Sequence, residues 1–104
     1  MCLLRSIKRK CDYMYVESAK LTFYVAHAFS LKDKRQVSRS LIQKTRQKFN
    51  VSVSEVDTQD VHRTLTIGIA VVSGEMSHAQ NSLDEIIRFM ENNTEAELTA
   101  INIE

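Results

Sequence analysis

The sequence predicts an α+β fold of the ferredoxin-like type: a βαββαβ sandwich with a four-stranded antiparallel sheet and two helices on one face. Three observations lead to this fold class. The chain has 104 residues, the length of one domain. Its apolar residues recur at every second position where a strand is expected and at every third to fourth position where a helix is expected. These spacings follow one another in the order strand, helix, strand, strand, helix, strand. No Pro interrupts that order, and two split βαβ units in this order form such a sandwich.

The first half of the chain predicts one strand and one helix. The strand is expected over residues 16–29, where large apolar side chains alternate with smaller or more polar ones. Ser30 and Asp33 then resemble a capping box in which Asp replaces the usual Glu, so they predict the start of a helix. The helix is expected over residues 31–49, because an apolar stripe repeats there at helical spacing. The members of the stripe are Val37, Leu41, Ile42, Thr45 and Phe49.

The second half predicts two strands, a helix and a last strand. Residues 51–57 give a strand, residues 58–63 a polar turn, and residues 64–73 the clearest strand of the chain. Gly74 breaks that strand, and a helix follows over residues 75–91 until Asn92 and Asn93 end it. Its apolar stripe predicts a core-facing side made of Met76, Ala79, Leu83, Ile86, Ile87 and Met90. Residues 97–103 are expected to form the last strand.

The N-terminal residues 1–13 are basic and follow neither period, so we expect a flexible extension ahead of a single domain over residues 14–104. A start of translation at Met14 would leave this extension out. Cys2 and Cys11 both lie in it, and their spacing fits neither a redox pair nor half of a zinc site. We therefore expect free thiols, no metal and no cofactor. No apolar run approaches the roughly 20 residues of a membrane-spanning helix, so we expect a cytoplasmic protein away from membranes.

Charge is strongly segregated along the chain. Residues 32–50 hold seven basic side chains against one acidic, whereas residues 51–104 hold ten acidic against two basic. Within the first predicted helix, Lys32, Arg35, Arg39, Gln43 and Arg46 form one row, and Lys34, Lys44 and Lys48 flank it. Such a row suits a phosphate backbone, because each neutralised phosphate releases counterions. The alternative is a solvated helix face that is balanced by Asp84, Glu85 and Glu91 of the second helix.

The predicted sheet does not resemble that of an RNA-recognition motif. That module stacks bases on aromatic side chains of its two central strands. Here the strand over residues 64–73 has no aromatic residue. Any nucleic acid is therefore expected to contact the helix and the loops, with little readout of base identity.

The sheet face opposite the helices is predicted to be small, uncharged and weakly apolar. A flat face of this kind favours association when it is left in water. We therefore expect a homodimer formed by this face, with a solvated monomeric face as the alternative. The predicted interface consists of Thr22, Tyr24, Ala26, Thr66, Gly68, Ala70 and Val72.

One acidic cluster could support enzyme chemistry. Glu55, Asp57, Asp60 and His62 lie around the end of the second predicted strand, where they could hold Mg²⁺ or Mn²⁺ or act as acid and base. Their spacing matches no established metal motif, and a polar loop that pairs with Arg63 explains them as well. With two Gly in the chain no glycine-rich phosphate loop can form. His27 and His78 are isolated, so we expect no catalytic residues and a protein that is not an enzyme.

Several stretches resemble a known family. Residues 30–35 read SLKDKR, residues 49–57 read FNVSVSEVD, and residues 68–73 read GIAVVS. Together with Ser40-Leu41, they are similar to the YlxP-like family of small bacterial proteins, which is grouped as a domain of unknown function. The resemblance implies a ferredoxin-like fold and no established catalytic residues. Genes of this family often lie beside those for ribosome-binding factor A and a translation initiation factor, which implies a role near ribosome assembly or translation.

The leading hypothesis is a dimeric protein that binds RNA or a ribosomal particle through its first helix. The expected phosphate contacts are Lys32, Lys34, Arg35, Arg39, Arg46 and Lys48. The partner is expected to be ribosomal RNA or a ribosomal subunit. A dimeric module that binds a protein or a small regulatory ligand is the alternative, and its binding would depend little on salt.

Overall fold

The computed structural model describes residues 14–103 and confirms the predicted βαββαβ order. The strands are β1 (Tyr15–Tyr24), β2 (Ser52–Glu55), β3 (Thr64–Ser73) and β4 (Glu97–Ile103). The helices are α2 (Leu31–Lys48) and α3 (Met76–Asn92). The predicted extension over residues 1–13, with both cysteines, lies outside the described residues.

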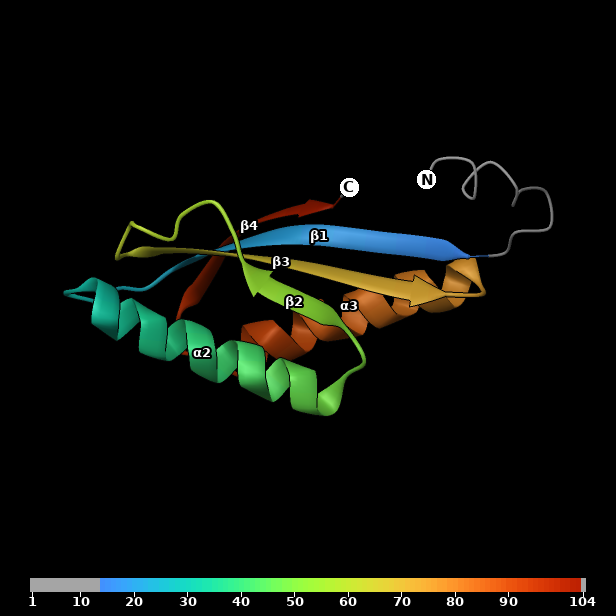
Figure 1. The fold of residues 1–104 in the computed structure, drawn as a ribbon, viewed down its shortest axis with the longest axis horizontal. Helices are drawn as coiled ribbons and strands as arrows, with labels where there is room; N and C mark the ends of the chain where they lie inside the picture. The colour runs from blue at the N-terminus through green and yellow to red at the C-terminus, as the bar shows by residue number, and fades with distance from the viewer. Residues whose placement is uncertain (1–13, 104) are drawn as a thin grey trace, which may run out of the picture.

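The four strands form one sheet in the order β2-β3-β1-β4, and every neighbouring pair is antiparallel. The two central strands pair along ten residues, with Leu21 opposite Ile67. Both helices lie on the same side of the sheet, and no helix of the described residues covers the other side (Figure 1). This arrangement is the predicted ferredoxin-like sandwich. Within residues 14–103, neither helix has the length and apolar character needed to cross a membrane.

The core lies between the sheet and the helices, and most of its residues are those that the alternation along the strands predicted to be buried. Leu21, Phe23, Leu65 and Ile67 are fully buried, so the predicted inward face of both central strands is confirmed. On α3, the predicted stripe from Ala79 to Met90 is buried as well. Met76 is the exception, because it is the first residue of α3 and remains 43% exposed.

Two strands end earlier than the alternation predicted. β1 stops at Tyr24, and the chain then turns, with the Ala28 N–H donating to the Val25 carbonyl at 3.2 Å. Ala26 therefore lies in a turn and not in the sheet. β2 stops at Glu55, and Asp57 adopts a left-handed backbone with φ 61°, a conformation that Asp tolerates better than most residues.

The helix α2 begins at the predicted capping residues. The Asp33 N–H donates to Ser30 Oγ at 3.2 Å, and Asp33 Oδ2 accepts from the Phe29 N–H at 3.0 Å. The buried side of α2 differs from the prediction, since Val37, Ile42 and Phe49 are only partly buried. The stripe that is buried consists of Lys34, Ser38, Leu41 and Thr45.

Lys34 is the most unusual member of this stripe, because its side chain has no exposed surface. Its ammonium group lies 2.9 Å from Glu55 Oε2 of β2. It also donates to the carbonyls of Thr58, Gln59 and Thr64 in and after the loop that joins β2 to β3. A buried charge is tolerated only when it is paired and hydrogen-bonded. Lys34 thus connects α2 to both β2 and this loop.

We expect Lys34→Met to lower the free energy of unfolding by about 3 kcal/mol or more, because it leaves the Glu55 carboxylate and three carbonyls without their cation. Urea denaturation measures this change. Lys32→Met, an exposed change on the same helix, should stay within about 0.5 kcal/mol of wild type. The double variant Lys34→Met/Glu55→Leu should recover part of the loss. If Lys34→Met unfolds at the same urea concentration as wild type, Lys34 does not have this stabilising role.

Candidate nucleic-acid interface

Four basic side chains form an exposed row along one side of α2, and we call them the cationic row. They are Lys32, Arg35, Arg39 and Arg46, with the exposed Gln43 between the last two. Arg39 and Arg46 also line a shallow hollow of about 340 Å³ between α2 and β2. The cationic row therefore lies on the side of α2 that faces the β2 edge of the sheet.

The remaining predicted phosphate contacts are not part of this row. Lys34 was expected to contact phosphate, and this prediction is wrong because its ammonium group is enclosed by protein oxygens. Lys48 lies on the opposite side of α2, with its ammonium 5.8 Å from the centre of the Phe49 ring and 5.7 Å from that of Phe89. Lys44 also turns to that side and donates to the Asn93 carbonyl at 3.4 Å.

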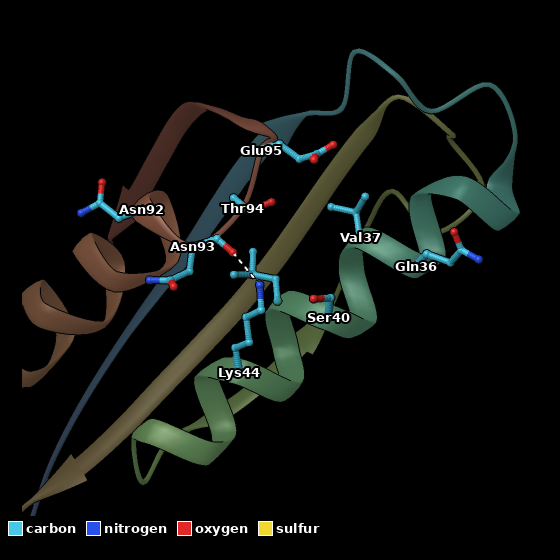
Figure 2. Close-up of a pocket in the computed structure, with 9 residues that line it drawn as sticks. Gln36, Val37, Ser40, Lys44, Asn92, Asn93, Thr94 and Glu95 are labelled. Carbon is cyan, nitrogen blue, oxygen red and sulfur yellow. Dashed lines mark hydrogen bonds between the residues drawn. The ribbon is translucent and has the colours of Figure 1, made fainter.

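A groove separates α2 from the end of α3 on that second side. It encloses about 630 Å³, and Val37 and Leu41 are among its apolar lining residues. Figure 2 shows Lys44 reaching from α2 toward Asn93, with Glu95 on the segment that follows α3. Among residues 14–103, Lys44 and Glu95 are the charged residues that line the groove, and their charges cancel. The groove therefore offers little attraction to a polyanion, unlike the cationic row.

The acidic residues of α3 do not neutralise the cationic row. Among residues 14–103 the ion pairs are Lys20–Asp57 and Lys34–Glu55. None joins the row to Asp84, Glu85 or Glu91, so the alternative of a row clasped by α3 finds no support in the described part of the chain. Asp33, the acidic residue nearest in sequence, accepts from the Phe29 backbone instead.

Arg46 has a second contact that ties it to the sheet. Its Nη2 donates to the Val53 carbonyl of β2 at 3.0 Å. The Val56 N–H donates to the carbonyl of Thr66 on β3, so the backbone groups of Val56 face the sheet. Backbone groups of successive residues in an antiparallel strand face alternate sides, and the Val53 carbonyl, three residues earlier, therefore faces outward from the sheet edge. Arg46 thus satisfies an outward-facing group of β2 and keeps an exposed side chain in the row.

The open sheet face is less uniform than predicted. Thr66 is buried, because Thr58 folds over it and their hydroxyls hydrogen-bond at 3.0 Å. Ala26 lies outside the strand. Lys20 belongs to this face and pairs with Asp57 at 2.8 Å. The residues that remain from the predicted interface are Thr22, Tyr24, Gly68, Ala70 and Val72.

The structure also reveals a cation–aromatic pair that the sequence reasoning missed. The guanidinium carbon of Arg63 lies 5.4 Å from the centre of the Phe29 ring. Phe29 directly precedes Ser30, the N-cap of α2. The sequence held a usable signal, because an apolar residue before an N-cap often packs on an apolar fourth helical residue. That residue is Lys34 here, so Phe29 has no apolar partner at this position.

The predicted acidic cluster does not come together as a metal site. Glu55 contacts Lys34 and Ser38 on the helix side of the sheet, whereas Asp57 pairs with Lys20 on the other side. Within residues 14–103, no three acidic, His or Cys side chains are arranged to hold a metal ion. Arg63, the expected partner of this polar loop, instead donates to the Ala28 carbonyl at 3.3 Å.

We expect Mg²⁺ or Mn²⁺ at millimolar concentration to leave the thermal unfolding midpoint unchanged, because Glu55 and Asp57 already pair with separate lysines. A metal that binds only the native state must raise that midpoint. Differential scanning fluorimetry with and without each ion checks this, with Asp57→Asn as the matched variant. A rise in wild type that is lost in Asp57→Asn would show that these carboxylates do form a metal site.

Two comparisons place the sequence among known proteins. Residues 16–103 match the family described as "Protein of unknown function (DUF503)". The chain is also 35% identical over 77 residues to the "Uncharacterized protein YlxP" of Bacillus subtilis (strain 168), an alignment that covers 74% of this chain and 84% of that protein.

Proposed function

The chain belongs to the DUF503 family of proteins of unknown function, and we propose that it binds structured RNA in the bacterial cytoplasm through its cationic row, without catalysing a reaction. One observation supports this proposal above all. The four cations are exposed on a rigid helix, and none has an acidic partner among residues 14–103. Ribosomal RNA, free or within a ribosomal subunit, is the proposed partner.

The dimensions of the row fit a phosphate backbone. From Lys32 to Arg46 the helix rises about 21 Å at 1.5 Å per residue, so several phosphates lie within reach. Three of the four cations are Arg, whose planar guanidinium binds phosphate oxygens through two parallel hydrogen bonds. Recognition of this kind depends on the shape and charge of the RNA. It gives strong salt dependence because bound counterions are released.

We expect the double variant Arg35→Glu/Arg39→Glu to bind ribosomal RNA and 30S particles about tenfold to a hundredfold more weakly than wild type. The slope of log affinity against log salt should fall by about 2 units in magnitude, because two phosphate contacts are lost. Fluorescence anisotropy across a salt series measures both quantities. The unfolding midpoint should stay near that of wild type, because neither side chain takes part in an ion pair with another residue of the 14–103 range.

The control variant Lys44→Glu/Arg88→Glu makes the same change in net charge outside the row. It should retain near-wild-type affinity if the row itself is the contact surface. Equal losses in both double variants would mean that net charge alone governs binding. Binding that barely changes with salt would contradict the proposal and favour a protein or small-ligand partner.

The uncovered sheet face favours a second candidate function, self-association. Val16 and Val72 are directly opposite each other on β1 and β3, and Val72 is 65% exposed. Neither of the helices α2 and α3 lies over this side of the sheet (Figure 1). A second copy that stacks on the same face would bury these valines together with Tyr24, and a two-fold axis allows the same surface to serve both copies.

We expect wild type to elute with the mass of a dimer in size-exclusion chromatography with light scattering. Val72→Lys should shift it to the mass of a monomer, because a buried ammonium without a partner is costly at such an interface. Met76→Lys makes the same kind of change at another exposed apolar residue, off the sheet face, and should leave the mass unchanged. A monomeric wild type would reject the dimer and leave the RNA proposal intact.

A further inference from the structure

We propose that Phe29 and Arg63 form a stacking platform for one unpaired base, so that the preferred RNA is a helix interrupted by a bulge or loop. This inference rests on the proposed RNA binding and makes the substrate class more specific. The platform lies at the start of α2, where the β1–α2 segment meets the β2–β3 loop. It adjoins the cationic row, whose first members follow Phe29 by three and six residues.

Phe29 is exposed to an unusual degree for an aromatic residue. At 71%, it is the most exposed of the large apolar side chains within residues 14–103. The cause is local, since the helical position on which it would pack is occupied by Lys34, and the Lys34 side chain turns inward to the β2–β3 loop. The ring is therefore left largely exposed, because the fourth helical position offers it no apolar contact.

The backbone and the guanidinium hold this exposed ring in a defined place. The Phe29 N–H donates to Asp33 Oδ2 at 3.0 Å, which fixes the backbone to the first turn of α2. Arg63 Nε donates to the Ala28 carbonyl at 3.3 Å, and the guanidinium carbon lies 5.4 Å from the ring centre. Because the ring remains largely exposed beside the guanidinium, part of its surface is free for a further flat group.

A nucleobase fits this arrangement better than a simple apolar contact does. Bases stack on Phe rings and on guanidinium planes, and stacking of this kind tolerates any base. A base that is paired within a helix cannot reach such a platform, whereas an unpaired base can. Lys32 and Arg35 would bind the phosphates on one side of that nucleotide. The sheet, which lacks aromatic residues on β3, would not be needed.

Three RNA hairpins with equal numbers of phosphates, each closed by a loop of abasic nucleotides, test the proposal in fluorescence anisotropy. One has a fully paired stem, one has a single unpaired adenosine in the stem, and one has an abasic nucleotide at the same bulge. We expect wild type to prefer the adenosine bulge over the abasic bulge by about fivefold to a hundredfold, the range of one base stacked on an aromatic ring. Phe29→Ala should abolish this preference, Phe29→Trp should keep it, and Met76→Ala should not change it.

The outcomes separate this inference from the proposed function. Arg35→Glu/Arg39→Glu should weaken binding to all three hairpins alike, because phosphate contacts do not depend on the base. If wild type binds the three hairpins equally and with strong salt dependence, the platform is wrong and the RNA function stands. An unchanged preference in Phe29→Ala also overturns the platform and would leave Phe29 to a protein partner. If wild type binds none of the hairpins at low salt, both proposals fail.

Discussion

The fold depends on the placement of one buried positive charge. Lys34 reaches from α2 into a set of oxygens from Glu55, Thr58, Gln59 and Thr64. The penalty for removing an ammonium group from water is large unless such partners are present, so the loop between β2 and β3 must close around the side chain. That closure in turn brings Thr58 over Thr66. The core beneath α2 and the β2–β3 loop therefore depend on the same contact.

The basic residues of α2 lie in three different surroundings. Lys34 stabilises the interior, Lys44 and Lys48 face the segment at the end of α3, and the cationic row faces outward on the β2 side. The high positive charge of residues 32–50 thus has more than one cause. Cations in the last turn, such as Arg46 and Lys48, also interact favourably with the negative end of the helix dipole. Lys32, Arg35 and Arg39 are left without such a structural reason, and for that reason they carry most weight in the proposed interface.

Periodic patterns predicted the fold well, because each strand and helix buries one side. Leu65 and Ile67 on β3, and Leu83 and Ile86 on α3, are buried as their spacing indicated. The pattern was weakest on α2, where hydrophobicity favoured the stripe through Val37 and Phe49. The buried stripe instead includes Lys34 and Ser38.

These two polar residues are buried only because Glu55 and the β2–β3 loop supply their partners, and such long-range contacts cannot be read from local spacing. The same limit explains Thr66, which alternation assigned to an open face and which Thr58 covers. It also explains the Phe29–Arg63 pair, whose two members lie far apart in the sequence. They come together through the pairing of β1 with β3, which continues as a hydrogen bond from the Val25 N–H to the Arg63 carbonyl.

The contact between Arg46 and Val53 has a consequence for how large an assembly this sheet can build. β2 and β4 are the two edges of the sheet, and an edge strand can recruit a strand from another molecule through its outward backbone groups. At the β2 edge, the Val53 carbonyl is already occupied. A chain with one obstructed edge can join edge to edge with one other copy through β4, after which β2 strands end the sheet on both sides. Growth into long fibrils needs two open edges in every molecule, and at the β2 edge the Arg46 guanidinium already occupies one of the backbone groups that an incoming strand would use.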